Sequence, residues 1–287
     1  MGQLQPFYEQ VQAHYDLSNE FFALFLDPSM TYSCAYFAHP ELTLAEAQQA
    51  KLDLSLEKCD LQPGQRLLDI GCGWGSAARR AATRFGVDVI GLTLSRNQHA
   101  YAERMSRHMP PGSGRIEFRL QGWEEFEEPV DAIVSIGAFE HFRLERHAFF
   151  FKHCYELLPA GGRMLLHSIV WPGADSLRER GIEAEHEHVL FAKFIRKSIF
   201  PGGQLCAPEV VIRHAEDTGF EVARVQSLQP HYARTLDCWA ANLQARREAA
   251  IVLTSPEVYE MYMHYLTDCA RYFRSGHIDV MQFTLKK

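Results

Sequence analysis

Hydrophobic positions follow two patterns along the chain. In residues 1–60 they are rich in aromatic side chains and are spaced as in helices. The triplet Ser18-Asn19-Glu20 predicts a helix start before the run FFALFL, and the spacing over residues 42–61 predicts a longer helix that ends before Pro63-Gly64. The first 60 residues therefore predict a helical N-terminal segment.

From residue 66 onward, short apolar runs alternate with amphipathic stretches. The runs predict strands at residues 66–71, 87–94, 115–121, 130–137 and 163–170. Helical spacing predicts helices at residues 76–86, 95–109 and 140–162. Such alternation predicts an α/β fold with a parallel, doubly wound sheet.

The alternation breaks at residues 171–205, which predict a helical insertion. It resumes with a helix at residues 208–220 and a strand at 221–228. Two further helices follow, and then a last strand at 279–287. No repeat or low-complexity linker divides the chain, so we expect one domain over residues 1–287. Its core would lie at 61–170, and residues 206–287 would complete the sheet.

Charge and cysteine content narrow the possible functions. Lys plus Arg number 29 against 36 Asp plus Glu, and the net charge of -7 disfavours partners such as nucleic acid or anionic membranes. The seven cysteines are widely spaced without a CxxC pair, which indicates reduced thiols and no zinc site. The first residues lack the apolar core of a signal peptide, and no apolar run approaches the ~18 residues of a membrane span. We expect a cytoplasmic protein with at most peripheral membrane contact.

A glycine-rich turn carries the first candidate site. In LLDIGCGWG (67–75), Asp69 ends a predicted strand and glycines such as Gly71 and Gly73 follow before a helix. Glycines there let a ligand approach the backbone and the helix N-terminus. Dinucleotide-binding proteins use GxGxxG and an acid after the next strand, whereas this chain has GxGxG and Thr93. Both departures disfavour NAD.

GxGxG after an acid-ended strand resembles the first motif of S-adenosylmethionine-dependent methyltransferases. Their cofactor has no pyrophosphate and needs no third, phosphate-spaced glycine. A tight turn without a ligand is the alternative, disfavoured because glycines lower stability unless a close approach requires them. Most such enzymes hold the ribose through an acid after the second strand. Here Gln98 is the candidate for that contact, and a solvated helix residue is the other interpretation.

Longer stretches resemble the mycolic acid cyclopropane synthases, relatives of cyclopropane fatty acid synthase, from about residue 5 to the end. They are HYDLSNEFFALFLDPSMTYSCAYF (14–37), LLDIGCGWG (67–75), GLTLSRNQ (91–98), QGWEEF (121–126), SIGAFEHF (135–142), LLHSI (165–169), IFPGG (199–203), SLQPHYARTLDCW (227–239) and QFTLKK (282–287). The resemblance implies a seven-stranded class I methyltransferase (Rossmann-like) sheet with an antiparallel last strand. Residues 1–60 would cap the cofactor, and the insertion at 171–205 would help to form an acyl-chain tunnel on the lipid side.

The resemblance also implies a set of cofactor contacts. Trp123 would stack near adenine, Glu124 would accept its amino protons, and Tyr15 would close over the methionine end. The full set is Tyr15, Tyr32, Ser33, Asp69, Gly71, Gly73, Thr93, Leu94, Gln98, Trp123 and Glu124. Without the family match, Trp123 and Tyr32 have an ordinary alternative as packing aromatics.

The family transfers a methylene group from S-adenosylmethionine to a cis double bond of a long acyl chain. An alkene has no proton to remove beforehand, so methyl transfer relies on proximity and alignment and leaves a carbocation. Aromatic faces stabilise a cation, and the candidates for this lining are Phe139, Phe142 and Phe200, with Tyr15 and Tyr232 also available. The acid in VSIGAFEHF (134–142) lies among them, which raises the question of its role.

The resemblance implies that a bound bicarbonate ion removes the proton that allows the ring to close. Its matching contacts are the side chains of Glu140, His167 and Tyr232 and the backbone of Cys34 and Ile169. Glu140 would accept the bicarbonate proton, and the other two side chains would donate to its oxygens. Taken singly, each has an ordinary alternative, as a helix N-terminal acid, a core histidine and a packing tyrosine. His141 is expected one layer behind the site.

Other products and functions stay open. Some relatives let water trap the cation, which gives a hydroxyl beside a methyl branch, although Phe139 before the acid is similar to the cyclopropanating members. A cofactor binder without catalysis, or a methyltransferase acting on nitrogen or oxygen, would not need Glu140, His167 and Tyr232 together. Residues 183–190 alternate Glu and His without the spacing of a helical metal site, so no metal is expected.

The expected partner is an unsaturated long-chain acyl substrate, and its carrier is open between acyl carrier protein and phospholipid. The mycolic members are thought to act on chains attached to acyl carrier protein. An acidic enzyme needs a local basic patch to meet an acidic carrier. The candidates, for which a solvated face is the alternative, are Arg178, Arg180, Lys193, Arg196 and Lys197.

Overall fold

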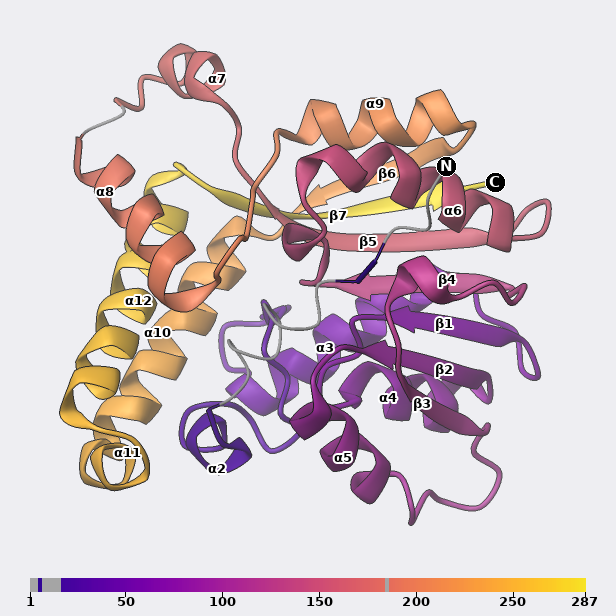
Figure 1. Ribbon diagram of the computed structural model, residues 1–287, viewed down its shortest axis with the longest axis horizontal. Helices are drawn as coiled ribbons and strands as arrows, with labels where there is room; N and C mark the ends of the chain where they lie inside the picture. Colours follow the sequence, from indigo (N-terminus) through magenta and orange to yellow (C-terminus); the bar gives the residue numbers. More distant parts are fainter. Residues whose placement is uncertain (1–4, 7–16, 184–185) are drawn as a thin grey trace.

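A computed structural model of the chain describes residues 5–6, 17–183 and 186–287. One seven-stranded sheet has the order β3-β2-β1-β4-β5-β7-β6 (Figure 1). The strands are β1 (Arg66–Ile70), β2 (Asp88–Thr93), β3 (Ile116–Leu120), β4 (Ala132–Ile136), β5 (Arg163–Val170), β6 (Glu221–Ser227) and β7 (Asp279–Lys286). β7 pairs antiparallel with both β5 and β6, whereas the other pairs are parallel. The predicted α/β class and the antiparallel last strand are confirmed.

Helices cover both faces of the sheet (Figure 1). They are α2 (Asn19–Phe22), α3 (Leu44–Glu57), α4 (Ser76–Phe85), α5 (Arg96–Met105), α6 (His147–Leu157), α7 (Ala174–Glu179), α8 (His186–Phe194), α9 (Pro208–Thr218), α10 (Gln229–Ala245), α11 (Arg247–Leu253) and α12 (Pro256–Ser275). Leu67 and Val134 pack with apolar residues of α3, α4 and α5, and Leu68 and Ile133 pack with those of α6 and α9. Strand residues alternate between the faces, so both sides of the central strands are apolar.

The helix starts follow from local capping chemistry. The Ser18 hydroxyl accepts a hydrogen bond from the Phe21 N–H at 3.2 Å, which confirms the predicted start of α2. Thr43 and Glu46 form a reciprocal capping box that fixes the start of α3. One expectation needs correction: three helices rather than two separate β6 from β7, because α11 breaks from α10 at Arg246.

A third apolar cluster lies beyond the carboxyl ends of the parallel strands. There α10 and α12 pack against each other and against α2, through large side chains such as Phe21, Trp239 and Tyr262. The predicted insertion at 171–205 is helical, with α7, α8 and a π-helical turn at Ile195–Ile199. Among the described residues, no helix combines the length and apolar character needed to cross a membrane.

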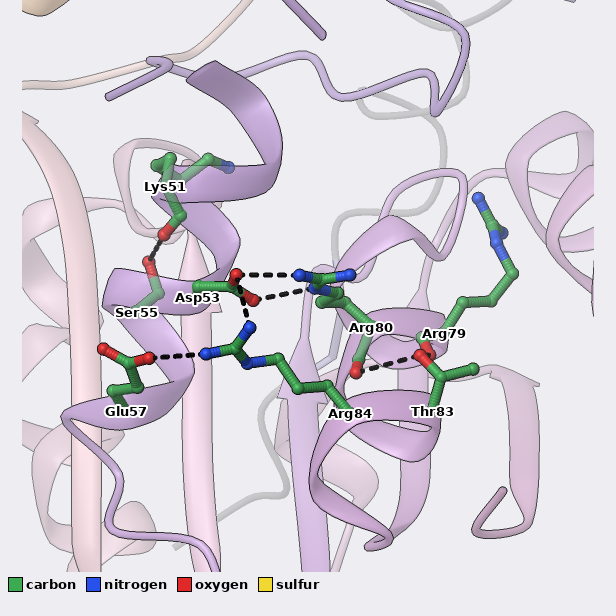
Figure 2. Close-up of polar contacts among 8 residues, drawn as sticks. All are labelled: Lys51, Asp53, Ser55, Glu57, Arg79, Arg80, Thr83 and Arg84. Carbon is green, nitrogen blue, oxygen red and sulfur yellow. Dashed lines mark hydrogen bonds and ion pairs between the residues drawn. The ribbon is translucent and has the colours of Figure 1, made fainter. Parts of the chain in front are cut away.

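Ion pairs hold α3 against α4 next to the glycine-rich turn (Figure 2). Asp53 accepts two hydrogen bonds from Arg80, at 2.7 and 2.8 Å, and also pairs with Arg84. Arg84 reaches Glu57 one turn further along α3. Because α4 begins directly after the turn, this contact fixes α3 and its Lys51 relative to the candidate cofactor site.

Candidate active site

The glycine-rich turn adopts a backbone that requires glycine. Gly71, Gly73 and Gly75 have φ of +78°, +55° and +80°, in the left-handed region that other residues rarely adopt. A Cβ on Gly71 would lie 2.3 Å from the Ala138 Cβ, so this turn packs closely against the loop after β4. A Cβ on Gly73 would meet nothing within 4 Å, because this glycine faces a cavity.

The cavity lies at the carboxyl ends of β1, β2 and β4. Of the predicted cofactor contacts, those on its wall are Tyr32, Ser33, Asp69, Gly71, Gly73, Thr93, Leu94 and Gln98. His141 and Phe142 also line it, so His141 lies closer to the site than expected. Lys51 and Trp74, which were not predicted from the sequence, line the cavity as well. Nothing in the sequence marks Lys51 as buried, whereas Trp74 lies inside the glycine motif itself.

Two buried charged groups face this cavity. Lys51 is fully buried and its Nζ donates to the Ser33 hydroxyl at 2.8 Å. Burial lowers the pKa of Lys51 to about 8, partly opposed by Cys34, Asp27 and Asp69. Burial raises the pKa of Asp69 to about 7, and its Oδ2 is buried with no partner among the described residues. A ligand that brings a hydrogen-bond donor or a positive charge to Asp69 would relieve this cost.

A threonine and a glutamine replace the acid expected after β2. The Thr93 hydroxyl donates to Gln98 Oε1 at 3.0 Å, and both side chains are buried at the cavity wall. This bond directs the amide oxygen of Gln98 toward Thr93 and leaves the amide nitrogen as a donor. A ribose hydroxyl can accept from such a donor.

Two predicted cofactor contacts, Trp123 and Glu124, and the predicted cation-lining residue Phe139 lie away from the cavity wall. Trp123 packs behind Phe142, at a ring-centroid distance of 5.5 Å, and edge-on to Phe150 at 5.1 Å. Glu124 is paired with Arg146 at 2.8 Å. Phe139, proposed above to face the cation, is 1% exposed. Its ring stacks on His147 with the centroids 3.9 Å apart. Tyr15 lies outside the described residues.

A second cluster of polar groups lies beside this cavity, where β4 and β5 end. The Ile169 N–H donates to Glu140 Oε1 at 2.6 Å, while Glu140 Oε2 is buried without a partner among the described residues. His167 Nε2 is likewise buried and unpartnered there. The two residues lie at neighbouring strand ends: Glu140 accepts from Ile169, two residues after His167, and the His167 carbonyl accepts the N–H of Gly137, three residues before Glu140.

Tyr232 and Cys34 pack in one apolar cluster with Ile169, the residue whose N–H binds Glu140. Burial raises the pKa of Glu140 to about 7. Burial raises the pKa of Tyr232 well above its usual range, and negative charge on Tyr265, Cys34, Cys269 or Glu140 would raise it further. The Tyr232 hydroxyl therefore stays protonated and is a hydrogen-bond donor at neutral pH.

Phe200 belongs to the same wall. It follows the π-helical turn at Ile195–Ile199, and its ring lies 6.4 Å from Tyr32, 5.7 Å from His141 and 5.6 Å from Tyr265 between centroids. Of the three predicted cation-lining phenylalanines, Phe142 lines the cavity. Phe200 does not line it but packs on Tyr32 and His141, which do. Among the described residues, no group of three His, Cys, Asp or Glu side chains could hold a metal ion.

The sheet order and the glycine-lined cavity define a class I S-adenosylmethionine-dependent methyltransferase fold. The structure of coclaurine N-methyltransferase bound to S-adenosylhomocysteine and N-methylheliamine shares this fold, with a TM-score of 0.83 at 22% identity over 100% of this chain and 84% of that one. A profile of the mycolic acid cyclopropane synthetase family matches residues 3–283. The chain belongs to this family, and it is an S-adenosylmethionine-dependent methyltransferase.

Its relatives are similar over their whole length. Cyclopropane mycolic acid synthase 3 of Mycobacterium tuberculosis is 55% identical over 286 residues, 99% of each chain. The S-adenosylmethionine-dependent methyltransferase UmaA of the same organism is 53% identical over 287 residues, 100% of each chain. The structure of cyclopropane synthase MmaA2, also from M. tuberculosis, has a TM-score of 0.97 at 53% identity and full coverage of both chains. The structure of mycolic acid cyclopropane synthase CmaA1 complexed with S-adenosylhomocysteine and CTAB has a TM-score of 0.96, also at 53% identity and full coverage of both chains.

Proposed function

We propose that this protein transfers a methylene group from S-adenosylmethionine to a cis double bond of a long-chain, mycolic-type acyl group and so forms a cyclopropane. Bound bicarbonate would be the base. The observation that carries the proposal is the pair of buried atoms without partners among the described residues, Glu140 Oε2 and His167 Nε2. Each unpartnered group costs roughly 1–3 kcal/mol, so a small ligand that both donates and accepts hydrogen bonds fits this site. Relatives named cyclopropane mycolic acid synthases support the product class.

The chain's own residues have separable roles in this proposal. When bound, S-adenosylmethionine supplies an electrophilic methyl group and bicarbonate supplies a base that is not attached to the chain. The glycine turn and Gln98 position the cofactor, and the contribution of the protein to methyl transfer is alignment. Tyr32 and Phe200 present rings that stabilise a substrate cation. Glu140 accepts a proton from the base, and His167 and Tyr232 donate to it.

Bicarbonate dependence tests the base directly. Turnover of a cis-unsaturated acyl substrate should fall in buffer freed of carbon dioxide and return when bicarbonate is added. Glu140→Gln should be inactive in both buffers while it still binds S-adenosylhomocysteine, because Glu140 does not line the cavity at the glycine turn. Turnover that is equal with and without bicarbonate would remove this base from the proposal.

We further propose acyl carrier protein as the acyl carrier. Lys193, Arg196 and Lys197 are exposed on α8 and the π-helical turn, which leads within three residues to Phe200. This basic segment therefore offers an acidic carrier a surface whose far end reaches the site. Arg178 and Arg180 are also exposed, although Arg178 pairs with Asp175 and Arg180 donates to the Gly276 carbonyl.

Charge reversal distinguishes the two carriers. Lys193→Glu with Lys197→Glu should raise KM for substrate on acyl carrier protein and leave kcat unchanged. The matched control is Arg107→Glu with Arg115→Glu. It makes the same change of charge near the amino ends of β2 and β3, away from the cavity. An effect that is seen only with phospholipid vesicles, or equally in both double variants, would contradict the carrier proposal.

A further inference from the structure

A buried polar network lies directly behind the imidazole of His167. In the sheet, His167 of β5 is opposite Gln282 of β7, and Gln282 is opposite Gln226 of β6. Lys58, at the carboxyl end of α3, lies over this row and donates to the side-chain oxygens of both glutamines. His167 and Gln282 are 1% and 0% exposed, so water does not compete for these bonds.

Lys58 fixes which way the Gln282 amide points. An ammonium group has donors only, so the atom of Gln282 that faces Lys58 is its oxygen, Oε1. The Gln282 amide nitrogen then faces the other way, toward the Ser55 hydroxyl at 2.9 Å and His167 Nδ1 at 3.2 Å. Ser55 in turn donates to the Lys51 carbonyl at 2.7 Å, a bond drawn in Figure 2, so its oxygen is free to accept. In this orientation the Gln282 amide nitrogen has two acceptors, whereas a flipped amide would turn its N–H groups toward the Lys58 ammonium.

The orientation of Gln282 determines the protonation of His167. Because the Gln282 amide nitrogen is a donor, His167 Nδ1 has to accept and carries no proton. We propose that Lys58 and Gln282 are positioning residues that hold His167 as the neutral tautomer protonated on Nε2, so that it presents one N–H donor to the site. The tautomer proposal deepens the proposed function. It rests on that function only for which bound ligand accepts the Nε2–H of His167. The tautomer itself follows from contacts within the chain.

The charges around the ring favour the neutral form. Burial lowers the pKa of His167 well below its usual range, and the positive charges of Lys51 and Lys58 lower it further. A neutral imidazole with its proton on Nε2 donates to an anion oxygen and does not compete with the anion for the substrate's proton. A histidine protonated on Nδ1 would instead present a lone pair, which repels an anion.

Nitrogen NMR of histidine side chains tests the tautomer in the cofactor-free protein. The ring signals of His167 are identified as those that disappear in His167→Gln. We expect a pyridine-type shift for Nδ1 and a pyrrole-type shift for Nε2. The reverse pattern, or two protonated nitrogens at neutral pH, would overturn the proposal whatever the enzyme's activity.

Gln282→Glu tests the cause. A glutamate of the same shape pairs with Lys58 and accepts from Nδ1–H, so the tautomer should reverse. Turnover should fall by roughly 10- to 100-fold, the range known from metal sites that lose the partner of a ligating histidine, with KM for S-adenosylmethionine unchanged. Gln226→Glu is the matched control, because it adds the same charge beside Lys58 without contacting His167, and it should keep both tautomer and turnover.

A second variant keeps the proposal testable if Gln282→Glu does not fold. Lys58→Met leaves Gln282 free to rotate, so the His167 signals should show a mixture of tautomers. An unchanged tautomer in both Gln282→Glu and Lys58→Met would show that the network does not control it. The proposed function fails separately, if the wild type has the expected tautomer but turns over no alkene in the presence of bicarbonate.

Discussion

Replacement of Glu140 by Gln should stabilise the ligand-free protein at alkaline pH even though it removes turnover. The side chain is 8% exposed, and burial raises the pKa of its carboxyl to about 7 from the ordinary 4.5. The Ile169 N–H donates to one oxygen, and no ion pair to the carboxylate forms within the described residues. The charged form of Glu140 is therefore disfavoured, because burial removes the carboxylate from water.

The sign and size of the effect follow from linkage. Between pH 4.5 and 7 the unfolded chain has lost this proton while the folded chain retains it, so the raised pKa makes stability fall as pH rises. The full loss is about 3 kcal/mol above pH 7, and about 2 kcal/mol of it develops between pH 5 and pH 8. Glutamine does not titrate and keeps an oxygen that accepts from Ile169.

Urea unfolding of both proteins at pH 5 and pH 8 measures this difference. Subtracting the two free energies of unfolding removes other titrating groups such as Asp69 and Lys51, which are present in both proteins. We expect the variant to gain about 2 kcal/mol relative to the wild type between the two pH values. An identical pH dependence in both proteins would show that the Glu140 carboxyl is not desolvated, and the reasoning about the site would be refuted.

Four further substitutions, of which Gly64→Ala is a control, separate cofactor contacts from structural ones. Gly73→Ala should lose about 1 kcal/mol of stability from its left-handed backbone and weaken S-adenosylhomocysteine binding by about tenfold, because its Cβ enters the cavity. Gly64→Ala has a similar φ of +82° and open surroundings outside the cavity, so calorimetry should show the stability loss alone. Gln98→Leu should weaken the same binding by about 1 kcal/mol, and unchanged affinity would exclude it as a ribose contact. Asp53→Asn weakens its bonds to Arg80, so it should lower the free energy of unfolding by about 1 kcal/mol, and with it the melting temperature, without a change in affinity.

The sequence predicted the sheet well because its central strands are apolar on both faces and end at turn glycines. The helix starts followed from side chains such as Ser18, which cap backbone N–H groups locally. The break between α10 and α11 was missed, because Arg246 and its neighbours have ordinary helix propensity and only their tertiary surroundings end the helix.

The candidate site was predicted less completely, because a motif reveals neither the direction in which a side chain points nor how deeply it is buried. Phe139 and Glu140 are neighbours in a 3₁₀ turn, where successive side chains point to different sides. Phe139 therefore packs on His147 while Glu140 reaches the Ile169 N–H. Trp123 has apolar neighbours on every side, which a motif does not reveal. Lys51 was missed because lysines are rarely buried, and only the folded structure shows its position beside Ser33.

The most direct test of the proposed reaction uses S-adenosylmethionine with a fully deuterated methyl group and a cis-unsaturated long-chain acyl substrate. Removal of one deuteron by the base and ring closure predict a product whose new carbon keeps two deuterium atoms and no protons. Its proton NMR spectrum should show the two ring methine protons and no olefinic protons. A product whose new methyl group keeps all three deuterium atoms, with or without a neighbouring hydroxyl, would contradict cyclopropane formation and show that the cation is resolved in another way.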